Sequence, residues 1–255
     1  MIPYFEQPTL TLGPISIHAF GVLLAVAIWV GHRVFRGRLR RAGLDLVTGD
    51  RLLFWVLLLG FAGAHLIDRL VYFPAETLAD PLSLLMFWKG ISSFGGFVGA
   101  IVGAVAFTAT GALRGRTWDY LDAVAYAFPF GWIFGRLGCF LAFDHPGAPT
   151  SFFLGQEYDG RVIHNLGLEE ALYTIALAAV FARLGRRPRA SGFFVGLLPV
   201  LYAPFRFVLD FLRAHDARYF GLTPAQYGAV AVLLAGLLIL RMRRGQPPAT
   251  ANPAA

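Results

Sequence analysis

The sequence has 255 residues, of which 57% are hydrophobic and 15% are charged, and its mean hydropathy is +0.61. This composition excludes a soluble globular domain and indicates a membrane protein. The net charge of +7 does not indicate nucleic-acid binding, because the arginines form short runs between apolar stretches, as topology signals do.

Apolar stretches long enough to cross a bilayer recur seven times along the chain. We place them at Ile15–Phe35, Leu52–Tyr72, Ile91–Ala112, Tyr120–Phe143, Leu168–Leu184, Gly192–Leu212 and Thr223–Met242. The sequence therefore predicts an all-α, polytopic membrane protein with about seven transmembrane helices. We expect a single membrane domain over residues 1–245 and a disordered Pro/Ala-rich tail over residues 246–255.

Arginine-rich segments lie in every second connection between the predicted spans. They fall between the first and second, the third and fourth, and the fifth and sixth spans, and after the seventh. With seven spans all four segments lie on one side, which the positive-inside rule makes cytoplasmic. The N-terminus is then expected outside and the C-terminus in the cytoplasm.

Small residues mark the third predicted span. Gly95, Gly99 and Gly103 recur at every fourth position, a spacing that lets two helix backbones approach closely. Ser92, Gly95 and Gly96 also form a polar, flexible entrance at which a lipid headgroup could meet the backbone. Helix packing and headgroup binding are alternatives at this point.

Charged residues appear in and just after the fourth predicted span. Arg136 lies inside it, where a charge costs about 2.5–3.5 kcal/mol on insertion scales and needs a partner, a cavity or a ligand. Asp144 and His145 follow about two helical turns later and are candidate general acid/base residues, with an ordinary polar loop as the alternative. Cys139, the single cysteine, excludes a disulfide and a multi-cysteine metal site, and we interpret it as a buried core residue.

Arg206, Asp210 and Arg213 share one face of the sixth predicted span, at spacings i, i+4 and i+7. A structural Arg–Asp pair is one interpretation. One carboxylate cannot neutralise these two arginines together with Arg136, so the excess positive charge favours a bound phosphate.

Together with their surrounding segments, these residues resemble the sequences of the prolipoprotein diacylglyceryl transferases. Those are bacterial membrane enzymes that move a diacylglyceryl group from phosphatidylglycerol to the lipobox cysteine of a lipoprotein precursor. The resemblance covers nearly the whole chain and rests on LGPISIHAFG, ISSFGGFVGAIVG, DAVAYAFPFGWIFGRLGCF and YAPFRFVLDFLR. Residues that match functional or signature positions of the family are Arg136, Arg206, Asp210, Arg213, Asp122 and Gly147.

The chain departs from the family pattern near the expected chemistry. Phe94 stands where the family has histidine, and Cys139 stands for the signature asparagine. Ala142-Phe143-Asp144 replaces Asn-Gly-Glu, and Phe20 replaces a tyrosine. We expect either a divergent branch with its own base or a paralogue with a changed reaction.

The resemblance implies a function and its partners. Arg136 and Arg206 would hold the phosphate of phosphatidylglycerol, with Arg213 in support and Asp210 orienting the arginines. Phe94 cannot act as a base, so our own candidate for a replacement base is His145, oriented by Asp144. Expected partners are phosphatidylglycerol, a prolipoprotein signal peptide with its lipobox cysteine, and membrane lipids in the bacterial inner membrane, with a periplasmic N-terminus. No metal or organic cofactor and no nucleic acid is expected. The alternatives are a non-catalytic paralogue that binds anionic phospholipid and an enzyme with another acceptor.

Overall fold

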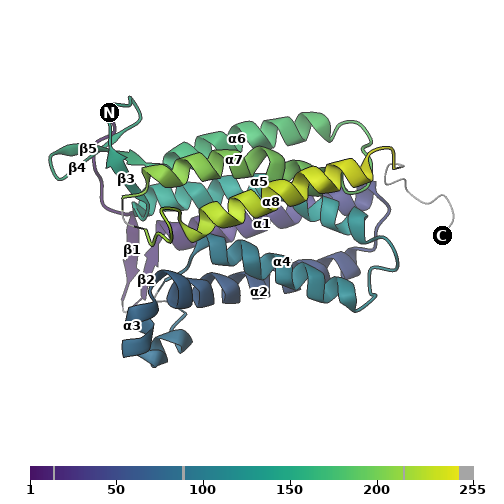
Figure 1. Cartoon of the computed structure of the whole chain (residues 1–255), viewed down its shortest axis with the longest axis horizontal. Coiled ribbons are helices and arrows are strands. Elements are labelled where there is room, and N and C mark those ends of the chain that lie inside the picture. Colours follow the sequence, from purple (N-terminus) through teal and green to yellow (C-terminus); the bar gives the residue numbers. More distant parts are fainter. Residues whose placement is uncertain (14, 88–89, 215, 247–255) are drawn as a thin grey trace.

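Seven long helices lie side by side in the computed structural model, which describes residues 1–13, 15–87, 90–214 and 216–246 (Figure 1). Each long helix of this part of the chain coincides with one predicted span. The helices are α1 (Ala19–Arg41), α2 (Leu46–Ile67), α4 (Ser93–Ala109), α5 (Thr117–Ala142), α6 (Leu166–Leu184), α7 (Phe193–Leu209) and α8 (Pro224–Arg243). The predicted tail lies outside the described residues from position 247 onward.

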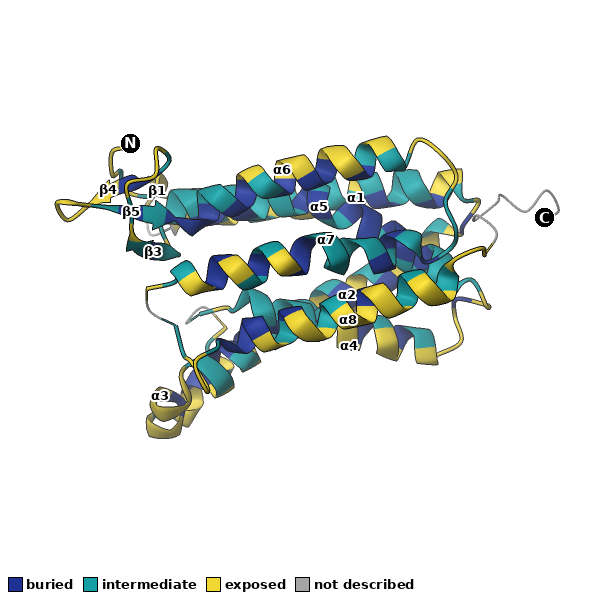
Figure 2. Cartoon of the chain, turned by 45° about the horizontal axis from the view of Figure 1, so that its top comes forward, coloured by how far each residue is buried: buried dark blue, intermediate teal, exposed yellow. Residues whose placement is uncertain are grey.

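The described helices identify the chain as a multi-pass membrane protein. Five are long and apolar enough to cross a membrane: α1, α2 with its π-helical continuation Asp68–Tyr72, α5, α7 with the 3-10 turn Asp210–Leu212, and α8. Of the other two, α4 has only 17 residues, and α6 carries three charged residues. Exposed positions, coloured yellow, occur along the helices (Figure 2). They include large apolar residues, for example Ile101, Val105, Ile175 and Leu234, which suits contact with lipid.

Two small antiparallel sheets correct the prediction of a purely α-helical chain. The strand β1 (Thr9–Leu12) pairs with β2 (Ile15–His18), where the first span was expected to begin. The alternation Ile-Ser-Ile-His is a strand pattern, and Gly13 supplies the positive φ of +61° in the turn. In the second sheet β5 (Arg161–Asn165) lies between β3 (Pro146–Pro149) and β4 (Gln156–Tyr158).

Both sheets lie at one end of the bundle, together with the short helix α3 (Pro74–Ala79) and the 3-10 turn Pro81–Leu85 (Figure 1). The basic segments meet at the other end. Arg38 Nη1 donates to Gly185 O at 3.2 Å, and Arg243 Nε donates to Ser191 O at 2.8 Å. The helix α1 continues to Arg41 rather than ending near Phe35, because arginine favours helices and cations suit a helix C-terminus.

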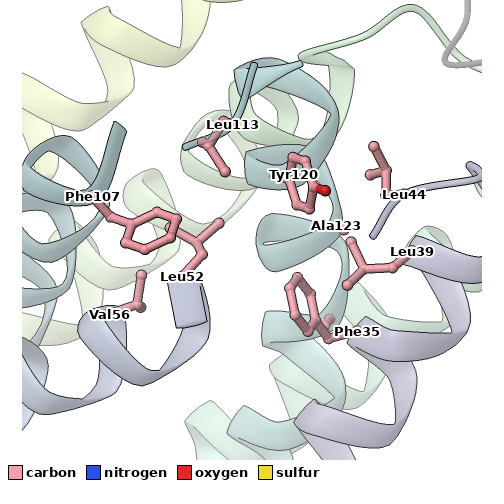
Figure 3. Packing of buried hydrophobic residues seen from close by; sticks show 10 residues of the cluster. Phe35, Leu39, Leu44, Leu52, Val56, Phe107, Leu113, Tyr120 and Ala123 are labelled. Carbon is pink, nitrogen blue, oxygen red and sulfur yellow. The ribbon is translucent and has the colours of Figure 1, made fainter. Parts of the chain in front are cut away.

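Close backbone contact between α2 and α4 explains the glycine repeat. A Cβ on Gly95 would lie 2.8 Å from Ile67 Cβ, and one on Gly103 would lie 2.5 Å from Trp55 O. Phe107 of α4 then packs over Leu52 and Val56 of α2, in a buried cluster that α1 and α5 complete (Figure 3). Packing is therefore sufficient to account for the small residues.

Candidate active site

A sharp turn after α5 brings the predicted acid/base residues back over the end of that helix. The helix ends at Ala142, and Phe143 takes a left-handed conformation with φ of +51°. The rings of Tyr4 and Tyr158 pack against Phe143, with centroid distances of 5.6 and 4.8 Å. Asp144 and His145 follow directly and hydrogen-bond to each other through Oδ1 and Nδ1.

Gly147 fixes the next part of this segment. Its backbone forms an isolated antiparallel bridge with Arg213, which joins the segment to the end of α7. A Cβ on Gly147 would lie 2.6 Å from His164 Cβ, so the position has no room for a side chain. The structure thus places Gly147 in a packing contact beside the predicted arginines.

Arg136 is the centre of a buried polar cluster between α5, α6 and α7. Its side chain is 2% exposed, and its Nε lies 3.0 Å from Oε1 of Glu170, which is also 2% exposed. The guanidinium lies over the ring of Trp132 at 4.5 Å, and Trp132 Nε1 donates to Glu170 at 3.3 Å. Tyr202 on α7 also donates its hydroxyl hydrogen to Glu170. The carboxylate therefore connects three helices around one arginine.

Sequence reasoning missed Glu170, and this residue corrects the expectation of uncompensated positive charge. Glu170 pairs with Arg136, while Asp216 pairs with Arg213 through a 2.6 Å contact to Nη1. The charges of the described cluster are therefore close to balance. An acidic residue within an apolar span is itself a functional signal, and Glu170 lies inside the fifth predicted span.

The cluster contains a hydrogen-bond donor that has no partner within the described part of the chain. Nη2 of Arg136 is buried and has no hydrogen-bond partner among the described residues. A buried polar group without a partner costs free energy, more so when it is charged. This nitrogen is a donor available to an anionic ligand.

Arg206 and Asp210 form a second buried pair, which was one of the two interpretations of their spacing. Nη1 of Arg206 lies 2.5 Å from Oδ1 of Asp210, whose side chain is fully buried. The other carboxylate oxygen accepts a hydrogen bond from Thr223 at 2.6 Å. Thr223 also caps α8 in a capping box with Gln226, so the start of α8 holds Asp210 in place. Arg213 lies nearer the surface, with Nε 3.9 Å from Asp210.

Cys139 lies between Arg136 and the Asp144–His145 pair. Arg136 Nη1 donates to Cys139 Sγ at 3.7 Å, and ligand atoms of Cys139, Asp144 and His145 lie within 4.8 Å of one another. Burial lowers the pKa of the His145 imidazole below its usual value, and the nearby charges of Arg213 and Arg136 act in the same direction. Asp144 opposes this shift, and the net effect favours a neutral ring that can accept a proton or bind a metal.

The residues predicted at the entrance of the third span have mainly structural contacts. Gly95 and Gly96 face α2, and Ser92 caps α4 by accepting from Gly95 N at 3.3 Å. Phe94, which stands where the family has histidine, packs against Gly228 of α8.

Comparison with known proteins agrees with the resemblance seen in the sequence. The family model described as prolipoprotein diacylglyceryl transferase matches residues 7–242. The phosphatidylglycerol–prolipoprotein diacylglyceryl transferase of Chromohalobacter salexigens is 31% identical, covering 96% of this chain and 95% of that protein. The transferase of the same name from Methylibium petroleiphilum is 30% identical, and the match covers 93% of this chain and 96% of that protein. That of Pseudomonas syringae pv. syringae is 28% identical over the whole of both chains.

Proposed function

The chain belongs to the prolipoprotein diacylglyceryl transferase family, and we propose that it transfers the diacylglyceryl group of phosphatidylglycerol to the lipobox cysteine of prolipoproteins. It is a transferase that acts in lipoprotein maturation, and glycerol phosphate is the other product. The alternative of a non-catalytic lipid-binding paralogue is not favoured, because relatives over nearly the full length are named as transferases.

The reaction makes a thioether, and its chemistry assigns roles to the two buried arginines. The acceptor sulfur attacks the glyceryl carbon, the bond from that carbon to the phosphate oxygen breaks, and its electron pair leaves with glycerol phosphate. Arg136 and Arg206 stabilise the negative charge that develops on this leaving group. The observation that carries the assignment is the unpartnered Nη2 of buried Arg136.

The remaining site residues support this phosphate site. Asp210 orients Arg206 through their 2.5 Å pair, and Arg213 contributes charge at the outer edge. Ser92, Gly95, Gly96 and Gly147 shape the approach of the headgroup. Because Arg136 and Arg206 are almost fully buried, the lipid reaches them only when neighbouring helices or the Asp144–Gly147 segment move.

Formation of the acceptor thiolate needs assistance. A free cysteine thiol has a pKa of about 8.5, so only a small fraction is ionised at neutral pH. The Asp144–His145 pair replaces the family histidine in this role, since burial lowers the pKa of the His145 imidazole and the ring lies beside the arginine cluster.

We place the protein in the bacterial inner membrane with seven crossings. The N-terminus and both sheets then face the periplasm, and the basic end of the bundle faces the cytoplasm. This orientation puts the arginine cluster at the membrane side on which a signal peptide emerges.

Complementation tests the proposal. We would express the wild type, Arg136→Gln and Arg69→Gln in a strain depleted of its own transferase and weigh a reporter lipoprotein. Arg69 is the matched control, because it is a buried arginine that pairs with its neighbour Asp68 at 2.6 Å outside the proposed site.

The wild type and Arg69→Gln should add a diacylglyceryl mass to the reporter, and Arg136→Gln should not. Membrane levels of all three proteins must be comparable. Lack of product from well-expressed wild type would refute the proposed reaction, and normal product from Arg136→Gln would refute the phosphate site.

A further inference from the structure

A cavity lined by arginines lies at the basic end of the bundle, where α7 begins and α8 ends (Figure 1). Its volume is about 360 Å³, within the range of about 300–1,000 Å³ that small-ligand sites occupy. Arg189, Arg243 and Arg244 supply its charge, and Phe193 and Leu240 supply apolar walls. None of the described residues that line it is acidic, so the cavity is strongly positive.

Arg243 is held in a fixed position beside this cavity. Its Nε donates to Ser191 O at 2.8 Å, and its guanidinium lies 5.2 Å from the centroid of the Trp118 ring. A Cβ on Gly192 would lie 3.0 Å from Arg243 Cγ, so the glycine leaves room for the arginine. These contacts use one nitrogen and one face of the guanidinium, and both terminal nitrogens can donate to a ligand.

Arg189 is held by contacts of the same kind. Its Nε donates to Leu184 O at 3.1 Å, and its guanidinium lies 5.3 Å from the centroid of the Phe193 ring. An arginine that is already positioned loses less conformational freedom when it binds a ligand. The two anchored guanidinium groups therefore differ from the exposed arginines that serve only as topology signals.

The positive charge of the cavity is not balanced by a neighbouring carboxylate. Asp119 accepts a hydrogen bond from Ser191 next to the cavity, but its other oxygen lies 2.8 Å from Arg116 Nε. Within the described residues, the three arginines of the cavity have no acidic partner. An anion bound among them would relieve their mutual repulsion.

We propose that this cavity binds the phosphate of an anionic phospholipid from the leaflet that meets the basic end of the bundle. With the orientation given above, this is the cytoplasmic leaflet. Guanidinium groups bind phosphate oxygens through paired hydrogen bonds, and basic pockets between transmembrane helices bind anionic headgroups. Since α8 is apolar enough to cross a membrane and ends at Arg243, the cavity lies at the depth of the headgroups.

The apolar surroundings favour a lipid over free phosphate. Phe193 and Leu240 line the cavity itself. Leu237 lies one helical turn before Leu240, towards the middle of the membrane, and is exposed. An acyl chain attached to the bound headgroup can therefore lie along α8.

This lipid is separate from the lipid substrate. Trp118 at the cavity and Arg136 in the proposed active site both lie on α5, 18 residues apart. At a rise of about 1.5 Å per residue, this separation is about 27 Å. The lipid bound in the cavity joins the start of α7 to the end of α8 and takes no part in transfer.

Lipid binding is tested on the whole protein, purified in detergent and delipidated. Native mass spectrometry counts the phosphatidylglycerol molecules that stay bound at increasing lipid concentration, with phosphatidylcholine as the zwitterionic comparison. The site variant combines Arg189→Gln with Arg244→Gln and keeps Arg243 with its structural contacts. The matched control combines Arg187→Gln with Arg241→Gln, two exposed arginines of the same end that do not line the cavity.

The site variant should bind one phosphatidylglycerol molecule at least roughly tenfold more weakly, since each arginine near an anionic headgroup contributes roughly fivefold in affinity. The control should bind as the wild type does. Arg244→Gln alone, at an exposed position, should weaken binding roughly fivefold and serves if the double variant unfolds. The proposed substrate site at Arg136 is intact in every protein, so a difference among them reports on this cavity whether or not the chain performs transfer.

The same experiment can overturn the site. Equal weakening in the site variant and the control would mean that general positive charge attracts the lipid, and unchanged binding in the site variant would remove the cavity from consideration. Phosphatidylcholine bound as tightly as phosphatidylglycerol would contradict an anionic headgroup. Inorganic phosphate in excess should leave the lipid bound, and displacement of the lipid by phosphate would identify a free-phosphate site instead.

Discussion

Arg136 Nε lies 3.0 Å from Oε1 of Glu170, and both side chains are 2% exposed. Removing one partner of such a buried pair leaves an uncompensated charge, which typically costs about 3–5 kcal/mol. Glu170→Gln should therefore lower the unfolding temperature in detergent and reduce transfer. Thermal unfolding followed by tryptophan fluorescence measures the first effect, and reporter modification measures the second.

Glu169→Gln is the control for this variant, on the same helix and with its own partner, His164. Because that pair lies outside the arginine cluster, its loss should leave transfer nearly unchanged. Equal transfer defects in the two variants would contradict a specific role for Glu170.

The hydroxyl of Tyr202 donates to Glu170 and so helps to position Arg136. Loss of a hydrogen bond to a charged group costs about 1.5–3 kcal/mol. If that loss acts through the position of Arg136, Tyr202→Phe should slow transfer roughly tenfold or more. The rate of product formation at saturating phosphatidylglycerol is the measurement.

Tyr173→Phe is a matched variant, because the Tyr173 hydroxyl donates to Leu201 O at 2.5 Å and does not touch Glu170. It should lose a hydrogen bond to a neutral carbonyl but keep its transfer rate. A similar loss of rate in both variants would mean that general stability, not the position of Arg136, sets the effect.

The helices were predictable because an apolar stretch of bilayer length carries its own signal. The pair Arg206–Asp210 was predictable for the same reason, since both residues lie on one helix at a fixed spacing. Glu170 and Arg136 lie on two different helices, and no local sequence pattern predicts a contact between them. The strand β2 was not predicted, because its four residues continue directly into the apolar run of α1.

The cluster of Cys139, Asp144 and His145 depended on one backbone angle. A helix that continued past Ala142 would have carried Asp144 and His145 away from Cys139. The left-handed conformation of Phe143, held by Tyr4 and Tyr158, reverses the chain instead. Phe is an uncommon residue in this conformation, so the sequence does not predict the turn.

Gly95 and Gly96 offer a direct test of the two interpretations of the third span. A Cβ on Gly95 would lie 2.8 Å from Ile67 Cβ, whereas one on Gly96 would meet Ala64 Cβ at an ordinary 3.7 Å. Gly95→Ala should therefore separate α2 from α4 and lower the unfolding temperature, and Gly96→Ala should be tolerated. Thermal unfolding of both variants in the same detergent distinguishes them. A stable Gly95→Ala would contradict the packing explanation, and a stable Gly96→Ala with a raised KM for lipid would favour headgroup contact there.

The two ends of the bundle can be assigned to the two sides of the membrane by cysteine labelling. Replacing Cys139 by serine removes the single cysteine of the chain and leaves a clean background. Phe220 is fully exposed near the end of the bundle that carries the sheets, and Arg187 is exposed at the basic end. Because the positive-inside rule makes the basic end cytoplasmic, Phe220→Cys should react with a membrane-impermeant maleimide in intact spheroplasts. Arg187→Cys should react only after the membrane is permeabilised. Reaction of both cysteines in intact spheroplasts would contradict the predicted odd number of crossings between the two positions, and the reverse pattern would invert the topology.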